Sequence, residues 1–443
     1  MEHKSYCDIV TFFDNENERT VDSLSLKYKD RKLLREKIEQ LMGPHFNESD
    51  IKGKRVLLKP NLVWEWHKPQ DEICLCTHES IILETLDFFL RRSPKSVIVG
   101  DAPIQGCQWD LVLTEGFHKE FNALGEKYGI PLRLIDFRRV TFDKKNNVLA
   151  TDRSTMDDYL IIDVGERSYL EDVTSGKDDM RVTDYNPDRM AIAHKKGMHK
   201  YCIRKEVLES DIVVTIPKTK THRMAGMTNS LKILVGINGD KEYLPHHRLG
   251  PVSCGGDCYK DKSLLRSIAE KGFDLANRNK GSFLYRPTYV MSKVLWKLSR
   301  PNKETSINAG WYGNDTVWRM VLDLNTIALY GRADGTIADT PQRTMYTLCD
   351  GIIAGQGEGP LNPTPLALGT LVFSNDPYLS DEVAGHLYHL NLEKVPLLRE
   401  AALINKTKDC SISINGLNAT MADIDELAVS VIMSAGWVNY TSK

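Results

Sequence analysis

The segment "DIVVTIPKTKTH", residues 211–222, changes from an apolar run to a basic one. The apolar part predicts a short buried strand, which Pro217 ends. Lysines then alternate with threonines, and in an extended chain this alternation places Lys218, Lys220 and His222 on one side. The segment therefore predicts a strand of an internal sheet that leads into a cluster of positive charge.

The chain around this segment alternates strand patterns with helix patterns. Such alternation predicts parallel βαβ units, so we expect an α/β fold in which a mostly parallel sheet is flanked by helices. Ligands of such sheets lie at the carboxyl ends of the strands. The expected strands cover residues 55–60, 96–103, 132–137, 211–216, 343–355 and 368–377, and the expected helices cover 79–92, 111–129 and 377–390.

Residues 1–443 are predicted to form one α/β unit with two insertions. The first, at about 140–200, is predicted to be irregular, and the second, at about 250–330, helical. In the second, residues 283–300 place basic groups beside Leu295 and Trp296, which suits a membrane surface. Pro287 interrupts that pattern, so an ordinary packed helix is the favoured interpretation.

Composition limits the classes of function. The formal net charge of the 443 residues is -2, which gives no general attraction to nucleic acid. The N-terminus lacks the pattern of a signal peptide, and no apolar run is long enough to cross a bilayer. Nine cysteines at irregular spacings do not form a disulfide framework. We therefore expect a cytoplasmic protein, in which any site for a small anionic molecule is a local concentration of basic groups.

Polar residues follow several of the expected strands. "LLKPNLV" offers Lys59 and Asn61, "CTHES" offers Thr77 and His78, and "VGDAP" offers Asp101. Each has a structural explanation, such as a helix cap for Thr77 or a turn for Asp101. Their shared position predicts convergence on one cleft, formed by Lys59, His78, Asp101, Lys218, Lys220 and His222.

The stretch "GMTNSLKILVGING", residues 226–239, follows the basic segment. "NSLKILVGI" reads as the start of a helix, and a helix start carries unpaired N–H groups and a positive dipole end. Together with Lys232 and the preceding lysines, it predicts a phosphate or carboxylate site. A solvated basic edge is the alternative.

Three further features carry weaker signals. "CDGIIAGQGEGP", residues 349–360, fits neither a P-loop nor a dinucleotide fingerprint, and after Asp350 its only charge is Glu358. Asp376 and Pro377 predict a helix start. Asp381 then lies beyond the cap, which predicts that its carboxylate faces the cleft and meets Lys218, Lys220, Lys232 or a cation.

Other pairs of residues have both structural and functional interpretations. The spacing of Asp315, Arg319 and Asp323 predicts one helical face, either as an ion-pair ladder or with an aspartate that orients a basic group. His246 and His247 are adjacent and either lie on the surface or bind a metal. The separation of Cys254 from Cys258 is a weak metal signal.

These segments together resemble the domain-of-unknown-function 362 family. The resemblance covers roughly residues 50–110 and 205–400 and includes "VLLKPNLV", "THES", "VGDAP", "DIVVTIPKTKTH" and "CDGIIAGQGEGP". "WYGNDTVWRMVLDLN", residues 311–325, resembles a branch found near bacterial cell-surface polysaccharide genes. Some relatives carry a ferredoxin-like iron–sulfur module. This chain lacks those cysteine runs, so that cofactor does not carry over, and the family implies no reaction.

The favoured hypothesis is an enzyme that acts on a small phosphorylated or carboxylated substrate in cell-surface polysaccharide biosynthesis. Histidines near neutral pH suit acid–base catalysis, and carboxylates suit orientation of those groups or a divalent cation. The candidate catalytic residues are His78, His222, Asp101 and Asp381, and the candidate substrate-binding residues are Lys59, Asn61, Lys218, Lys220, Lys232 and Glu358.

Two alternatives remain open at this point. A metal- or cofactor-dependent redox protein or isomerase would use His78, His222, His246 and His247 as ligands. A non-catalytic binding or scaffold protein of glycan assembly would use the basic segment for recognition alone.

Overall fold

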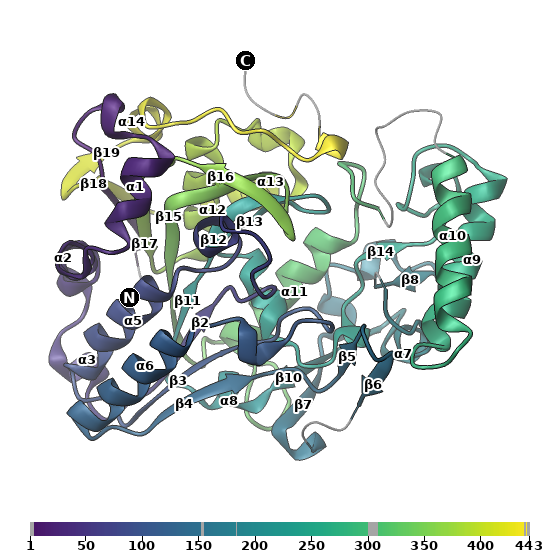
Figure 1. Ribbon diagram of the computed structural model, residues 1–443, viewed down its shortest axis with the longest axis horizontal. Coiled ribbons are helices and arrows are strands. Elements are labelled where there is room, and N and C mark those ends of the chain that lie inside the picture. The colour runs from purple at the N-terminus through teal and green to yellow at the C-terminus, as the bar shows by residue number, and fades with distance from the viewer. Residues whose placement is uncertain (1–3, 152–154, 183, 300–308, 438–439, 441–443) are drawn as a thin grey trace.

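A computed structural model describes residues 4–151, 155–182, 184–299, 309–437 and 440. Its centre is a sheet of mostly parallel strands with helices on both faces, so the predicted α/β class is confirmed (Figure 1). The strands in spatial order are β19 (Leu417–Ala419), β18 (Cys410–Ile414), β1 (Ser5–Thr11), β17 (Thr370–Ser374), β15 (Thr344–Glu358), β11 (Ile212–Ile216), β2 (Arg55–Pro60), β3 (Ser96–Asp101) and β4 (Leu132–Asp136).

The parallel part of the sheet is formed by β15, β11, β2, β3 and β4. Its strands lie close to the ranges that the sequence predicts, because each contains an apolar run, although β15 continues beyond its apolar part to 15 residues. Three short strands extend the sheet beyond the end of β11: β12 (Lys218–His222), β13 (Gly226–Thr228) and β16 (Asn362–Leu366). The N-terminal strand β1 and the C-terminal pair β18–β19, which the sequence analysis did not predict, complete the other edge.

Alternate residues of the central strands face opposite layers of helices. Val56, Leu58 and Val214 belong to the core beneath the first layer, whereas Leu57 and Val213 belong to the core beneath the second. The first layer includes α1 (Val21–Lys27), α2 (Arg31–Met42), α5 (Glu79–Leu90) and α6 (Glu115–Tyr128), with α3 (Glu48–Ile51) and α4 (Asp71–Cys74) beside it. The second includes α8 (Lys205–Glu209), α11 (Val317–Tyr330), α12 (Pro377–Leu387), α13 (Pro396–Asn405) and α14 (Met421–Glu426).

Most of the remaining elements lie on the right of Figure 1, with β7 and β10 at the lower centre. The region predicted to be irregular contains small antiparallel sheets, and the later region contributes a helical hairpin. These elements are β5 (Thr141–Asp143), β6 (Val148–Ala150), β7 (Tyr159–Asp163), β8 (Met180–Arg181), α7 (Asp188–Ala193), β9 (His194–Lys195), β10 (Met198–Arg204), β14 (His247–Arg248), α9 (Leu264–Arg278) and α10 (Tyr285–Leu298).

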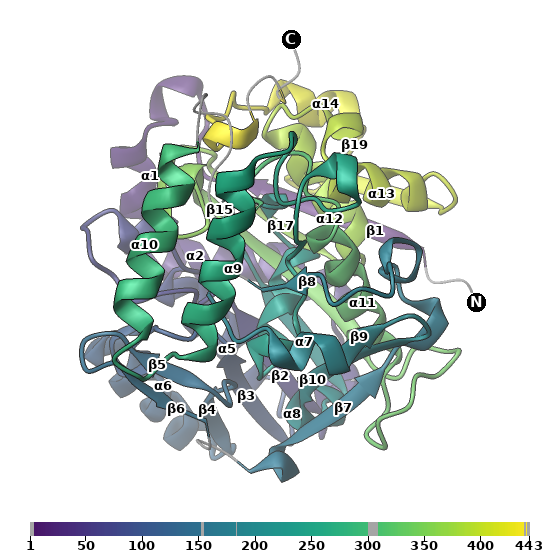
Figure 2. The ribbon, with the colours of Figure 1, turned by 90° about the vertical axis from the view of Figure 1, so that its right-hand side faces the viewer.

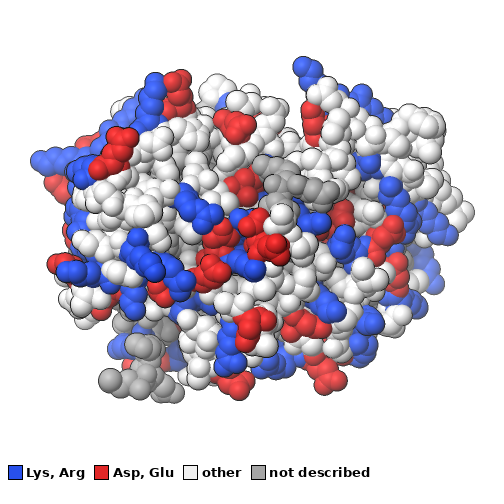
Figure 3. All heavy atoms as spheres, turned by 90° about the horizontal axis from the view of Figure 1, so that it is seen from below, with Lys and Arg blue, Asp and Glu red and all other residues white. Residues whose placement is uncertain are grey.

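The described surface carries both signs of charge. On the face seen from below, Lys and Arg are interspersed with Asp and Glu, and neither sign forms a large patch of its own (Figure 3). No described helix has the length and apolarity that crossing a membrane requires.

Candidate anion-binding site

A cavity of about 510 Å³ lies at the carboxyl ends of β2 and β3, against the β12–β13 hairpin. This is where the topology of a parallel sheet places a ligand. Basic side chains converge on its walls from different parts of the chain. They are Lys144, Lys220, His222, Arg223, Lys232, Lys241, His246, Lys280 and Lys293.

Asp101, in the floor of the cavity, belongs to a buried ion pair whose other member, Lys59, does not itself line the cavity. The ammonium group of Lys59 lies 2.6 Å from a carboxylate oxygen of Asp101, and both side chains are shielded from solvent. Asp101 also accepts hydrogen bonds from the backbone N–H groups of Leu62, at 2.7 Å, and Ala102, at 2.8 Å. Burial lowers the pKa of Lys59, while Asp101 opposes that shift. Asp101 therefore fixes Lys59 and the ends of two strands.

Gly236 allows the next segment to cover this ion pair closely. A Cβ atom at this position would lie 1.9 Å from an Asp101 oxygen and 2.4 Å from the Lys59 nitrogen. Only a residue without a side chain permits that approach. The glycine belongs to a 3-10 helix, Lys232–Ile237. The run that the sequence predicts to begin a helix is therefore helical, but as a short 3-10 helix.

The β12–β13 hairpin places Lys220 and His222 in the cavity wall. Lys220 pairs with Thr228 and His222 with Gly226, whose φ of 81° allows the chain to reverse. The Lys220 ammonium group donates to the Leu75 carbonyl at 2.5 Å. Burial lowers the pKa of Lys220 to about 8, against a weaker opposing effect of nearby cysteines.

His222 is held in its neutral form. Its Nδ1 atom accepts hydrogen bonds from the N–H groups of Met224, at 3.1 Å, and Ala225, at 3.2 Å. Burial, with Lys232 as the next cause, holds the pKa of His222 well below its ordinary value. Because Nδ1 accepts, Nε2 carries the proton, so His222 can donate a hydrogen bond from Nε2.

Lys232 and Lys241 bring two more cations to the same space. Among the described residues, no hydrogen bond or salt bridge joins a partner to the Lys232 ammonium group. Burial lowers its pKa to about 7, helped by Lys220 and Lys59. Lys241 donates to the carbonyls of Val235 and Asn238, at 3.1 and 3.4 Å, and burial lowers its pKa to about 7 as well.

Neutral polar atoms in the cavity wall also lack partners. The hydroxyl of Thr228 and the Oδ1 atom of Asn61 are buried and make no hydrogen bond within the described chain. Buried polar groups normally have a partner, which can be a bound molecule. The wall therefore offers both unpaired charge and unpaired hydrogen-bonding atoms.

The outer wall comes from the two insertions and is partly aromatic. It contains Phe142, Tyr185 and Tyr285, and the Lys280 nitrogen lies 4.9 Å from the centre of the Phe142 ring and 5.1 Å from that of Tyr185. Lys280 also donates to the side chain of Gln105 at 2.9 Å. Such a wall suits the flat face of a ring or a sugar.

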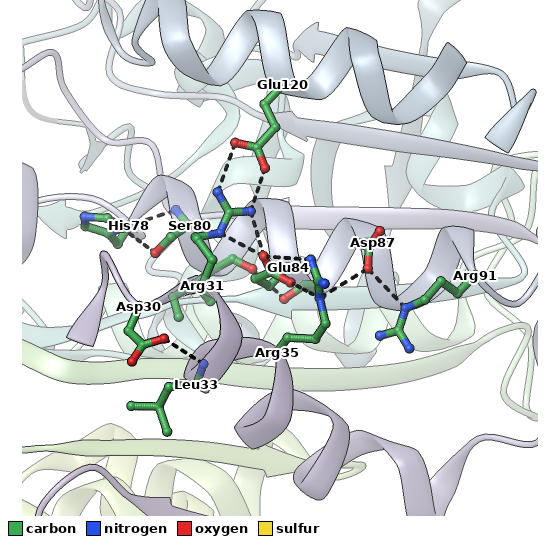
Figure 4. Close-up of polar contacts among 12 residues, drawn as sticks. Asp30, Arg31, Leu33, Arg35, His78, Ser80, Glu84, Asp87, Arg91 and Glu120 are labelled. Atoms are coloured by element: carbon green, nitrogen blue, oxygen red, sulfur yellow. Dashed lines mark hydrogen bonds and ion pairs between the residues drawn. The ribbon is translucent and has the colours of Figure 1, made fainter. Parts of the chain in front are cut away.

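His78 does not line the cavity, contrary to the predicted convergence. It precedes α5 as its N-cap, where Nδ1 accepts from the Ser80 N–H at 3.2 Å (Figure 4). Its ring stacks on Tyr28 with centroids 3.9 Å apart. Burial lowers the pKa of His78 to about 3. Thr77, which the sequence analysis proposed as a helix cap, does not cap α5. Its hydroxyl accepts a hydrogen bond from the Asn61 N–H and donates one to the Ile216 carbonyl, so it joins the ends of β2 and β11.

Lys218 also lies outside the cavity. Its ammonium group is 2.6 Å from Asp350, with both side chains fully buried. It donates as well to the Tyr28 hydroxyl at 3.0 Å and to the Ile73 carbonyl at 2.9 Å. Lys218 is therefore fully paired inside the protein. This pairing could not be predicted from the sequence, because Asp350 is far from Lys218 along the chain.

Asp381 and Glu358 are likewise placed elsewhere. Asp381 is buried and accepts from the Leu231 N–H at 3.3 Å, immediately before the segment that carries Lys232. None of its described hydrogen bonds reaches a lysine, so the prediction that it meets one is wrong. Burial raises its pKa to about 7. Glu358 accepts from the Ala435 N–H at 2.8 Å.

Asp323 does not share the partners of Asp315 and Arg319, although the three residues were predicted to lie on one helical face. Asp315 and Arg319 form the predicted ion pair at 3.2 Å, but Asp323 is buried and bonds to Ser168 and Tyr201. Asp376 caps α12 as predicted.

The four histidines proposed as metal ligands are not assembled. His222 and His246 line the cavity, whereas His78 and His247 do not. Over the ranges that the structure describes, no group of three His, Cys, Asp or Glu side chains could hold a metal ion.

Sequence reasoning missed Lys241, Lys280 and the aromatic wall. Lys241 follows "GINGD" directly and carries no pattern of its own. The others lie in insertions whose position on the sheet is set by tertiary contacts. The aromatic spacing in "YRPTY", residues 285–289, was the one available signal.

Comparison with known proteins assigns a family. The model described as "Domain of unknown function (DUF362)" matches residues 139–386, more than half of the chain. The chain belongs to the DUF362 family. No curated protein matches it. A crystal structure of a Thermotoga maritima protein aligns with 76% of this chain and 56% of its own, at 10% identity and a TM-score of 0.32. The chain thus spans about half of that protein, and a likeness this weak carries no argument.

Proposed function

We propose that the protein is an enzyme that binds a small phosphorylated or carboxylated substrate in this cavity. The observation that carries the proposal is the convergence of Lys220, Lys232 and Lys241 on one buried space, with Lys232 free of any described partner. Clustered ammonium groups repel one another and lose hydration. An anion relieves both effects, so the cavity favours a negatively charged ligand.

The wall suggests how such a ligand is held. Lys220 and Lys241 are fixed by carbonyl oxygens and supply positioned charge. Thr228 and Asn61 have hydrogen-bonding capacity to spare. Lys59 acts indirectly, because its ammonium group is already paired with Asp101.

Acid–base chemistry fits Lys232 better than a histidine. A pKa of about 7 lets its amine exchange a proton near neutral pH. An anionic ligand raises that pKa and so favours the protonated form. His222 stays neutral and can donate from Nε2 to an oxygen of the substrate. Lys232 and His222 are accordingly the proposed catalytic residues. His78 and Asp381 are no longer proposed as catalytic, because neither lines the cavity.

The aromatic wall and the family resemblance narrow the range of candidate substrates. Phe142, Tyr185 and Tyr285 could stack on a sugar ring, so a sugar phosphate fits both walls. The resemblance of residues 311–325 to a branch near surface-polysaccharide genes supports a role in polysaccharide assembly. The unpaired cysteines suit a reducing cytoplasm.

Thermal melting with different anions tests the binding step. Phosphate should raise the melting temperature more than chloride at equal ionic strength, and a ligand at 100 times its Kd adds about 2.7 kcal/mol. Lys232→Met should lose the difference, while exposed Lys32→Met should keep it. Equal melting temperatures in phosphate and chloride would contradict the proposed anion site.

Mass spectrometry of small molecules retained by the purified protein tests the enzymatic step. The retained molecule should be an anion that the wild-type protein converts on incubation and the Lys232→Met protein does not. A retained anion that is never converted would leave a binding protein and overturn the enzymatic role.

A further inference from the structure

The helical hairpin α9–α10 leaves apolar side chains in solvent. Almost half of the large exposed apolar side chains in the described chain lie between residues 264 and 298. They are Leu264, Leu265, Ile268, Leu275, Phe283, Leu284, Val290, Met291, Val294 and Leu298. Clustered exposure of this kind marks an interaction surface rather than ordinary scatter.

Within each helix, the exposed apolar side chains lie on the face opposite the buried ones. In α9, Leu264, Ile268 and Leu275 recur at helical spacing opposite the buried Ala269 and Phe273. In α10, the spacing of Val290, Val294 and Leu298 places them opposite the buried Trp296. Figure 2 shows the two helices side by side on the surface turned toward the viewer.

The two helices pack closely enough to act as one unit. A Cβ atom at Gly272 of α9 would lie 2.2 Å from the Ser292 hydroxyl oxygen of α10. Phe273 of α9 packs against two rings of α10, with centroids 5.5 Å from Tyr289 and 6.5 Å from Trp296. The outward apolar residues are therefore not needed to hold the hairpin together.

Positive charge borders the apolar surface. Between residues 260 and 299, Asp261 is the only exposed carboxylate. The exposed basic side chains without an ion-pair partner in the described chain are Lys260, Lys262, Lys271, Arg286, Lys293 and Lys297. Apolar side chains with basic neighbours are the pattern of helices that lie in the interface of an anionic bilayer.

We propose that the α9–α10 hairpin docks on an anionic membrane surface, with its outer face in the headgroup region. A second copy of the chain is the competing occupant. A two-fold contact would bring the same basic flanks against each other, which is unfavourable. Anionic lipid instead complements them. Docking would also place the cavity beside the headgroups, because Tyr289 and Lys293 of α10 line its outer wall.

Vesicle flotation tests the proposal and does not depend on a ligand in the cavity. The protein should float with equimolar phosphatidylglycerol and phosphatidylcholine, not with phosphatidylcholine alone, and high salt should weaken binding. Met291→Glu with Val294→Glu should lower the binding constant about tenfold or more. Leu26→Glu with Leu403→Glu, equally exposed on α1 and α13, should leave it unchanged.

Charge variants and hydrogen exchange complete the test. Lys271→Gln and Lys297→Gln should each weaken binding about fivefold. When anionic vesicles are added, amide hydrogen exchange of the wild-type protein should slow in residues 264–298. This measurement does not depend on whether a variant folds. Protection elsewhere, flotation unaffected by the α10 variant, no flotation at all, or a vesicle-free dimer that Met291→Glu dissociates would each overturn the proposal.

Discussion

Two clusters of charge in this protein are built on opposite plans. Along α5, the buried carboxylates of Glu84 and Asp87 face the guanidinium groups of Arg31, Arg35 and Arg91 (Figure 4). Arg31 continues the network to Glu120, at 2.7 Å. Positive and negative groups alternate, and each buried charge has a partner from a neighbouring helix.

The cavity gathers mostly positive charge, although Asp101 and Asp184 also line it. Lys220, Lys232 and Lys241 share it with Asp101, which is already paired with Lys59. A protein gains no stability from such an arrangement, since burying an unpaired ammonium group is unfavourable. The contrast teaches that the first cluster joins helices, whereas the second is kept for a partner that is not part of the chain.

The largest expected effect comes from breaking the paired cluster. Glu84→Gln leaves Arg31 and Arg35 facing a neutral group and should lower the free energy of unfolding by about 3 kcal/mol. Denaturant unfolding measures it, with exposed Glu36→Gln as the control expected to change little. If Glu84→Gln lowered the free energy of unfolding as little as Glu36→Gln does, the ion-pair network would not stabilise the fold. The contrast between a stabilising charge cluster and a ligand-binding one would then not hold.

Gly236→Ala tests how closely the 3-10 helix covers the cavity floor. The new methyl group would overlap Asp101 and Lys59, which should lower the free energy of unfolding by about 2 kcal/mol. Gly116→Ala in α6 is the matched control, because a Cβ there meets nothing nearer than 3.6 Å. A Gly236→Ala protein as stable as wild type, with its phosphate response intact, would contradict the close contact.

Lys232→Met should act in the opposite direction from Glu84→Gln. Without an anion, removing an unpaired buried charge should raise the free energy of unfolding by about 1 kcal/mol. The gain should shrink from pH 7 to pH 8.5. In that window the unfolded chain still holds the lysine proton and folded Lys232, with a pKa of about 7, has released it, so wild-type stability rises with pH.

Stability curves of wild type and Lys232→Met in chloride, at several pH values, measure this difference. Destabilisation by the substitution at pH 7 would mean that Lys232 has a partner within the protein.

Asp381→Asn should have the smallest effect at acidic pH. Burial raises the pKa of Asp381 to about 7, so its stabilising contribution is full below the unfolded pKa of about 4 and is lost progressively as the pH rises from about 4 to 7. The amide should match wild type within about 0.5 kcal/mol near pH 4, and its advantage should grow up to pH 7 and stay constant above it. Anion binding should persist. If Asp381→Asn lost the increase in melting temperature with phosphate but kept normal stability, Asp381 would be part of the anion site.

The sheet was predictable because its strands are short apolar runs in a regular alternation with helices. β2, β3 and β11 begin and end near the expected residues for that reason. The edge strands β1, β18 and β19 were not predicted, since they mix polar and apolar residues and form only through pairing with distant partners.

The candidate site was predictable only in part. Alternation in "KTKTH" correctly placed Lys220 and His222 in one strand. It could not distinguish Lys220, which lines the cavity, from Lys218, which Asp350 neutralises. That distinction depends on which carboxylates reach each lysine in three dimensions. Lys241 and Lys280 enter the site through folding of segments that carry no local signal.

The most direct test is a crystal structure grown with tungstate, an anomalous scatterer that resembles phosphate. The account predicts a tungstate ion in the cavity, with its oxygens within hydrogen-bonding distance of the Lys232 ammonium group and the Thr228 hydroxyl. Lys232→Met crystals should lose it. Tungstate bound only at exposed lysines, with the cavity free of the anomalous signal, would contradict the claim that this cluster of lysines is an anion site.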